Sequence, residues 1–96
     1  MVKHYVMWKI VDKDGKSAAE NVAEIKAGLE ALVGVIPGLL KAEVNLGYSE
    51  AYNAMLYSEF ESKEALADYR VHPAHKAVQK IVHNAMEQRA SFDVEA

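Results

Sequence analysis

The sequence predicts one α+β domain in which a four-stranded antiparallel sheet carries its helices on one face. Three observations indicate this fold. The chain has 96 residues, a length that suits one hydrophobic core, and 51% of them are hydrophobic, which excludes a wholly disordered chain. Segments with strand and helix periodicity also follow one another in the order βαββαβ. We therefore expect a single domain over residues 1–96.

The chain begins with a predicted strand over residues 3–11, which are β-branched and aromatic and lack Gly and Pro. Its residues 4, 6, 8 and 10 share one face. Ser17 and Glu20 then form a capping box. Apolar residues at helical spacing predict a helix over 18–34 that ends at Gly34.

Two further strands are predicted over residues 39–46 and 54–61. In both, apolar and polar side chains alternate. We expect the inward face of the first to carry Leu40, Ala42, Val44 and Leu46.

The second helix is predicted in two pieces, over 62–70 and 73–87, because Pro73 disfavours helical backbone at His72 and suits the first position of a new helix. Residues 89–95 form a short last strand. This order of elements is that of the ferredoxin-like fold.

Two helices can cover only one face of such a sheet. The other face would expose a contiguous group of large apolar residues, which monomers rarely do. We therefore expect a homodimer through this open sheet face. The group consists of Tyr5, Met7, Val11, Met55 and Tyr57.

Composition excludes several classes of protein. There is no cysteine, so disulfides and thiolate metal sites are excluded. The net charge is −3 and the positive charges are scattered, which disfavours nucleic acid as a partner. No apolar run approaches the roughly 20 residues that a membrane span needs. We expect a cytoplasmic protein with no membrane or nucleic-acid partner.

Three histidines are candidate functional residues. His72 and His75 lie at the predicted helix break, and His4 lies on the first strand. Tyr69 precedes the break by one turn, and Asp93 on the last strand could accept the ring proton of a histidine.

Several roles are open to these groups. They could cap the helix break, perform acid–base catalysis, or line a binding pocket that performs no chemistry. Metal binding is less favoured because His72 and His75 lack a third strong ligand at a typical spacing. His83 is expected on an ordinary helix face, and no cofactor motif occurs.

The sequence resembles the stress-responsive A/B barrel (Dabb) family of the dimeric α/β-barrel group. The resemblance rests on four segments and covers essentially the whole chain. They are Lys3-His4, IPGLL over 36–40, F-x-S-x-E-A-L over 60–66, and Y-x-x-H-P-A-H over 69–75. The family implies a homodimer whose two sheets pack into a central barrel.

The function of most of the family is unassigned. One member, a plant cyclase, closes a linear polyketide by aldol condensation without a cofactor. The resemblance implies that His75 and Tyr69 correspond to its catalytic residues, with His4 and Asp93 as further candidates. His72, Trp8 and Val78 are candidate binding residues.

The sequence thus leaves three functions open. These are a dimeric protein of unassigned, plausibly stress-related role, a cofactor-free cyclase or lyase acting on a small apolar or carbonyl compound, and a purely structural dimer. A pocket that performs chemistry should measure roughly 300 Å³ or more.

Overall fold

The computed structural model describes all 96 residues and contains seven helices and strands. No helix is long and apolar enough to cross a bilayer. The elements are β1 (Val2–Ile10), α1 (Ala18–Glu30), β2 (Leu39–Leu46), β3 (Ala54–Phe60), α2 (Lys63–Val71), α3 (Pro73–Ala85) and β4 (Met86–Glu95).

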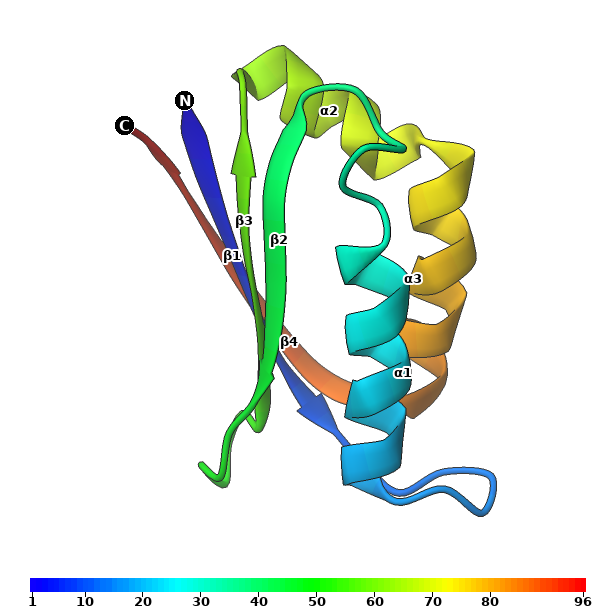
Figure 1. Ribbon diagram of the computed structural model, residues 1–96. Helices are drawn as coiled ribbons and strands as arrows, with labels where there is room; N and C mark the ends of the chain where they lie inside the picture. Colours follow the sequence, from blue (N-terminus) through cyan, green and yellow to red (C-terminus); the bar gives the residue numbers. More distant parts are fainter.

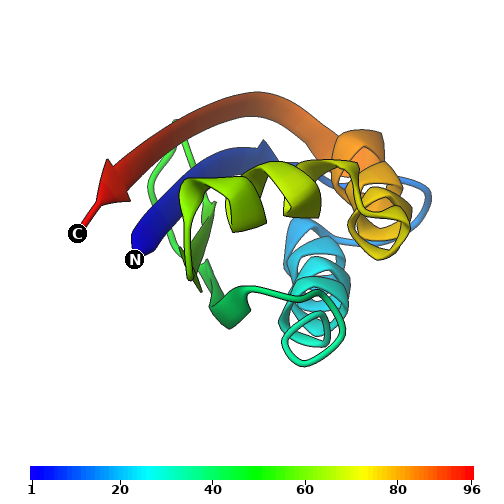
Figure 2. The same ribbon diagram turned by 90° about the horizontal axis from the view of Figure 1, so that it is seen from above.

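The four strands form one antiparallel sheet in the order β2-β3-β1-β4, with all helices on one face (Figure 1). Helices α1 and α3 lie side by side, and α2 lies across one end of the sheet (Figure 2). The ferredoxin-like βαββαβ prediction is confirmed. The break between α2 and α3 falls at His72, whose backbone is extended at φ −66° and ψ 134°.

The core lies between the sheet and the helices. Every second residue of β1 and of β3 is buried, which is the period of a strand with one covered face. On β1 these residues include His4, a polar group 3% exposed within an apolar row. The opposite layer comes from α1, through residues such as Ile25, and from α3. The predicted inward face of β1 is confirmed.

Helix α1 ends at Glu30, four residues before the predicted end. Leu32 and Ile36 are buried, as their helical spacing suggested, but they lie in turns. The chain tightens there, since the Leu32 N–H donates to the Leu29 carbonyl, three residues back. Periodicity alone does not distinguish such turns from a helix.

The inward face of β2 also differs from the prediction. A bulge between Leu39 and Lys41 shifts the pairing with β3. Leu39 is therefore buried, and Leu40 is 48% exposed. Leu46, at the end of the strand, is exposed as well.

Strand β4 begins at Met86, so the second helix is shorter and the last strand longer than predicted. Met86 has extended backbone and pairs with Ile10, while the Val11 N–H donates to the Ala85 carbonyl. Pairing with β1 therefore overrides the helix preference of this segment.

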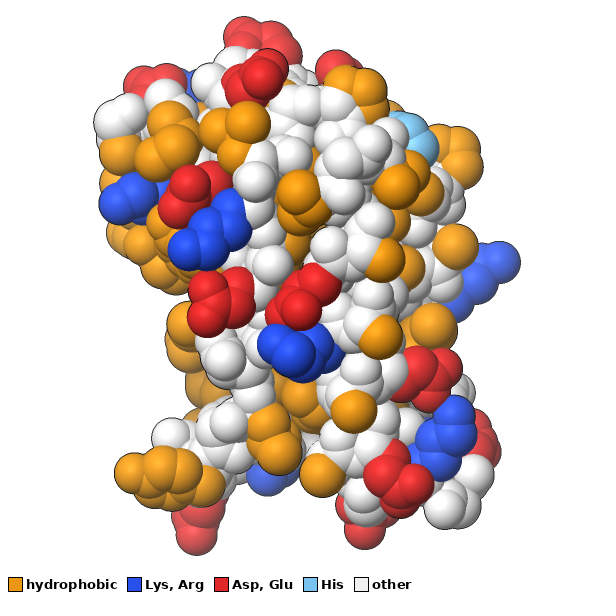
Figure 3. All heavy atoms as spheres, in the orientation of Figure 1, with side chains coloured by type: hydrophobic (Ala, Val, Ile, Leu, Met, Phe, Trp, Pro, Cys, Tyr) orange, Lys and Arg blue, Asp and Glu red, His pale blue; other side chains and the backbone are white.

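The sheet face away from the helices is apolar across β1, β3 and β4. We call this the open face patch, and it consists of Tyr5, Met7, Met55, Tyr57, Ala90 and Phe92. The Tyr5 ring packs against Tyr57 and Phe92, with centroids 5.2 and 6.5 Å away. Phe92, which the sequence analysis missed, is 67% exposed. Hydrophobic atoms gather along this side of the molecule, at the left of Figure 3.

Two glycines with nearly the same backbone conformation allow us to test how the close packing of α2 against Gly38 affects stability. Gly38 and Gly34 have φ of +84° and +87°. A Cβ at Gly38 would lie 2.5 Å from the Ala65 Cβ, whereas one at Gly34 would meet nothing within 4 Å. We expect Gly34→Ala to lower the free energy of unfolding by about 1 kcal/mol, through backbone strain alone. Gly38→Ala should cost about 2–4 kcal/mol, since a clash adds to that strain. Urea denaturation measures both, and equal losses would contradict the packing described.

Candidate functional site

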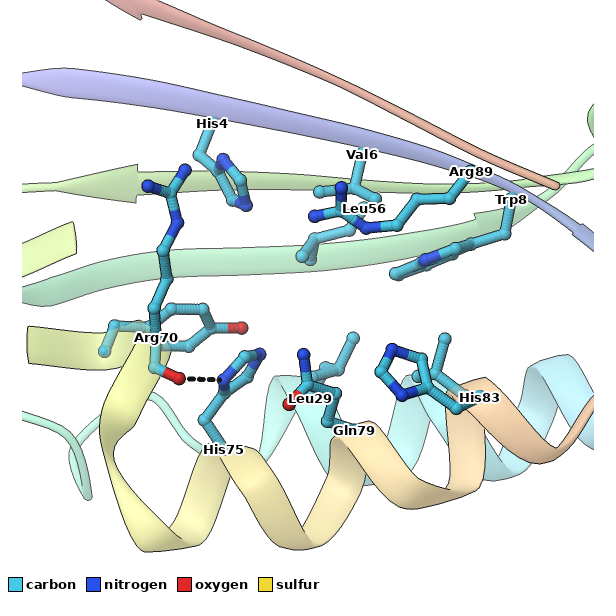
Figure 4. A pocket seen from close by; sticks show the side chains of 12 residues that line it. His4, Val6, Trp8, Leu29, Leu56, Arg70, His75, Gln79, His83 and Arg89 are labelled. Carbon is cyan, nitrogen blue, oxygen red and sulfur yellow. Dashed lines mark hydrogen bonds between the residues drawn. The ribbon is translucent and has the colours of Figure 1, made fainter. Parts of the chain in front are cut away.

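A cavity of about 170 Å³ lies between the sheet and the helices. Its wall includes His4, Tyr69 and His75, three of the residues singled out in the sequence, together with Trp8 (Figure 4). They come from β1, α2 and α3, so the cavity brings together residues that are far apart in the sequence.

His4 is held by Asp93, its partner in the pairing of β1 with β4. Cross-strand partners point to the same face, and the His4 Nδ1 is hydrogen-bonded to Asp93 Oδ1. The other carboxylate oxygen, Oδ2, accepts from Arg70 Nη2 at 3.0 Å. Partial burial would raise the pKa of Asp93, but its bond with His4 and the charge of Arg70 together hold that pKa below its usual value.

This arrangement defines the protonation of His4. Burial lowers the pKa of the imidazole and outweighs the opposing effect of Asp93, so the ring is neutral at pH 7. A carboxylate can only accept, so the single proton is on Nδ1. The Nε2 atom is therefore a free base, and the ring extends from β1 into the cavity (Figure 4).

His75 lies in the first turn of α3, on the opposite wall. Its Nδ1 is 3.4 Å from the backbone carbonyl of Arg70, which can only accept (Figure 4). Burial lowers the pKa of this imidazole too. His75 thus also carries its proton on Nδ1 and an unprotonated Nε2.

Tyr69 is 3% exposed and supplies the third polar group. Its ring packs edge-on against Phe60, with centroids 4.9 Å apart, and lies 4.1 Å from the His75 ring. Burial raises the pKa of its phenol to about 12, so the hydroxyl stays protonated. The Tyr69 side chain lines the cavity, and its hydroxyl makes no hydrogen bond within the protein. Since no enclosed polar atom lacks a partner, this hydroxyl is open to the cavity and available to a ligand.

The structure places two expected binding residues elsewhere. His72 caps α3, its Nδ1 accepting from the Ala74 N–H at 3.0 Å, and it does not line the cavity. Val78 packs between the helices, so close to Gly28 that a Cβ there would lie 2.9 Å from Val78 Cγ1. The expectation that these two residues line the pocket is corrected. Trp8 does line it.

Four polar residues of the wall were missed as site residues in the sequence. The spacing of His75, Gln79 and His83 by four residues places all three on one face of α3, and this signal was present. Arg70 and Arg89 complete the set.

No group of three or more His, Asp or Glu side chains is placed to hold a metal ion.

The cavity is smaller than the roughly 300 Å³ expected for a pocket that performs chemistry. An apolar cavity of about 150 Å³ accepts benzene, so this one suits a compact molecule rather than a long chain. Its wall combines two histidines, each with an unprotonated ring nitrogen, and one protonated hydroxyl. Such a set can remove a proton and also donate a hydrogen bond to an oxygen.

Solved structures share this fold. A dimeric ferredoxin-like protein of unknown function from Bacteroides fragilis is 35% identical, with a TM-score of 0.84 over 99% of this chain and 95% of that one. At3g17210 from Arabidopsis thaliana is 29% identical, with a TM-score of 0.83 over 100% and 95%. A hydroxynitrile lyase from Passiflora edulis shares the fold at 14% identity, with a TM-score of 0.78 over 97% and 90%.

Among curated proteins there is no significant match. Residues 2–96, nearly the whole chain, match the profile of the stress responsive A/B barrel domain, Dabb. The chain therefore belongs to the stress responsive A/B barrel family.

Proposed function

We propose that this protein is a cofactor-free acid–base enzyme, a lyase or cyclase, that acts on a small carbonyl compound. The observation that supports this most is the meeting of two neutral histidines and the Tyr69 hydroxyl in one cavity. The family description, stress responsive, is consistent with a role under stress and leaves the chemistry open.

His4 is the general base of this proposal. Its Nε2 takes a proton from the carbon next to the carbonyl, and the electron pair of the broken C–H bond forms an enolate. Asp93 stabilises the resulting imidazolium through the Nδ1 proton, as an acidic partner does for a histidine base. The sequence motif favoured His75 as the base, but the carboxylate is bonded to His4.

Tyr69 and His75 act on the other side of the substrate. The Tyr69 hydroxyl donates to the enolate oxygen, whose charge appears only as the proton leaves. In a cyclase the enolate carbon then attacks a second carbonyl, and the alkoxide that forms takes the proton from the His4 imidazolium. In a lyase the enolate instead expels a group from the β-carbon as the carbon–carbon double bond forms, and the leaving group takes that proton. The free Nε2 of His75 accepts a hydrogen bond from a substrate hydroxyl.

Exchange of α-protons for deuterium tests this chemistry without the natural substrate. We expect the protein in D₂O to accelerate exchange in small ketones such as cyclohexanone, followed by proton NMR. Asp93→Asn should lower that rate by about 10²-fold or more, because a neutral amide does not stabilise the His4 imidazolium and its NH₂ can donate to Nδ1, which favours the wrong tautomer. Tyr69→Phe, which removes only the hydroxyl, should lower it by a similar factor.

His72→Asn is the matched control. It removes an imidazole from the same motif but keeps a side-chain oxygen that can cap α3, so exchange and stability should stay near those of the wild type. Exchange that equals the buffer rate for every ketone, or that survives both Asp93→Asn and Tyr69→Phe, would refute the proposal.

We also propose that the protein is a homodimer through the open face patch. On β4 the apolar side chains point to this patch, whereas Arg89 and Asp93 point to the helix side. A strand that packed only against the core of its own chain would show the opposite arrangement. Solved structures of this fold are dimeric proteins, among them the 35% identical one.

Light scattering should give about twice the chain mass of 10.6 kDa. Met7→Glu should yield monomer or aggregate, because an unpaired charge buried between two sheets costs several kcal/mol. Ala27→Glu, on an exposed position of α1, should leave the dimer intact. A monomeric wild type at micromolar concentration would reject this assembly.

A further inference from the structure

Arg89 brings a guanidinium with no carboxylate partner to the cavity wall. Its only side-chain hydrogen bond is a long one of 3.5 Å to the Ser91 hydroxyl, and it takes part in no ion pair within 4.0 Å. Arg70, the other arginine of the wall, is already paired with Asp93. Arg89 is thus the one cation of the cavity with its charge unmatched.

Arg89 lies at the exposed edge of the cavity, on the helix side of the sheet. It is the pairing partner of Trp8, so both side chains are on the helix side of the sheet. Its guanidinium lies beside Leu56 and Val6, facing Gln79 and His83 of α3 (Figure 4). Its charge also lowers the pKa of both His4 and His75, as a small effect beside that of burial.

The cavity wall contains two arginines and three histidines but no carboxylate, although the chain as a whole has a net charge of −3. An arginine presents donors in a planar fork that matches a carboxylate with two parallel hydrogen bonds. The amide of Gln79 adds a donor on the facing helix. A carboxylate bound there would replace the partner that Arg89 lacks.

We infer that the ligand of this cavity is a compact carboxylate, with Arg89 binding the carboxylate group and the apolar body lying on Val6 and Leu56. This inference rests on the proposed function and narrows its substrate class to a small carbonyl compound that bears a carboxylate. The carbonyl end then reaches His4, His75 and Tyr69.

Benzoate and its neutral analogue benzamide are suitable probes, because the two have the same ring and nearly the same shape. Titration of ¹⁵N-labelled protein, followed at the Trp8 indole N–H, should show benzoate binding about ten-fold more tightly. Arg89→Gln should reduce the affinity for benzoate to that for benzamide. Lys80→Gln, which removes an exposed charge of α3 away from the cavity, should keep the ten-fold preference.

Equal affinities in the wild type, a preference that survives Arg89→Gln, or no saturable benzoate binding at millimolar concentration would overturn the inference. The readout is binding alone, so it is separate from the exchange assay. A benzoate preference without α-proton exchange would reject the acid–base proposal and leave the carboxylate site. Exchange without a benzoate preference would reject only the carboxylate site.

Discussion

The pairing register of β4 on β1 is the constraint on which the site depends. One register places the Asp93 carboxylate beside the His4 imidazole and Arg89 beside Trp8, all on the helix side of the sheet. A shift of one residue would move the two charged groups to the open face and bring Phe92 inside. The bonds of Asp93 with His4 and Arg70 oppose such a shift, because both would be lost. The polar cavity wall and the open face patch are therefore two results of one strand pairing.

Arg70 connects the two histidines. Its guanidinium holds the carboxylate that accepts from His4, and its backbone carbonyl accepts from His75. Both acceptors fix a proton on Nδ1, so both Nε2 atoms are left as bases. The helix break is what makes this possible, because it releases the Arg70 carbonyl from the regular bonding of a continuous helix.

Local signals in the sequence predicted most of the fold. Alternation in residues 3–11 identified the face of β1, and Pro73 identified the helix break. Their positions on the first strand and at the helix break, and then the resemblance to the family, singled out His4, Tyr69 and His75, which the structure brings to one cavity. The predictions that were wrong, or that could not be made, depend on pairing between segments distant in the sequence. The bulge that exposes Leu40 lies in the pairing of β2 with β3, and the choice of His4 rather than His75 as the partner of Asp93 follows from the register of β4. No local pattern contains either fact.

The proposed chemistry depends on His4 and His75 being neutral and presenting unprotonated Nε2 atoms to one cavity. The most direct measurement is ¹⁵N NMR of the imidazole nitrogens between about pH 5 and pH 8, where histidine titrates. Since the pKa of each is lowered, each ring should be neutral above the ordinary value of 6.5 and take its proton only as the pH falls below it. At pH 7 we expect a protonated Nδ1 and an unprotonated Nε2 in both rings. A charged imidazole, or a proton on Nε2 of either ring at that pH, would contradict it.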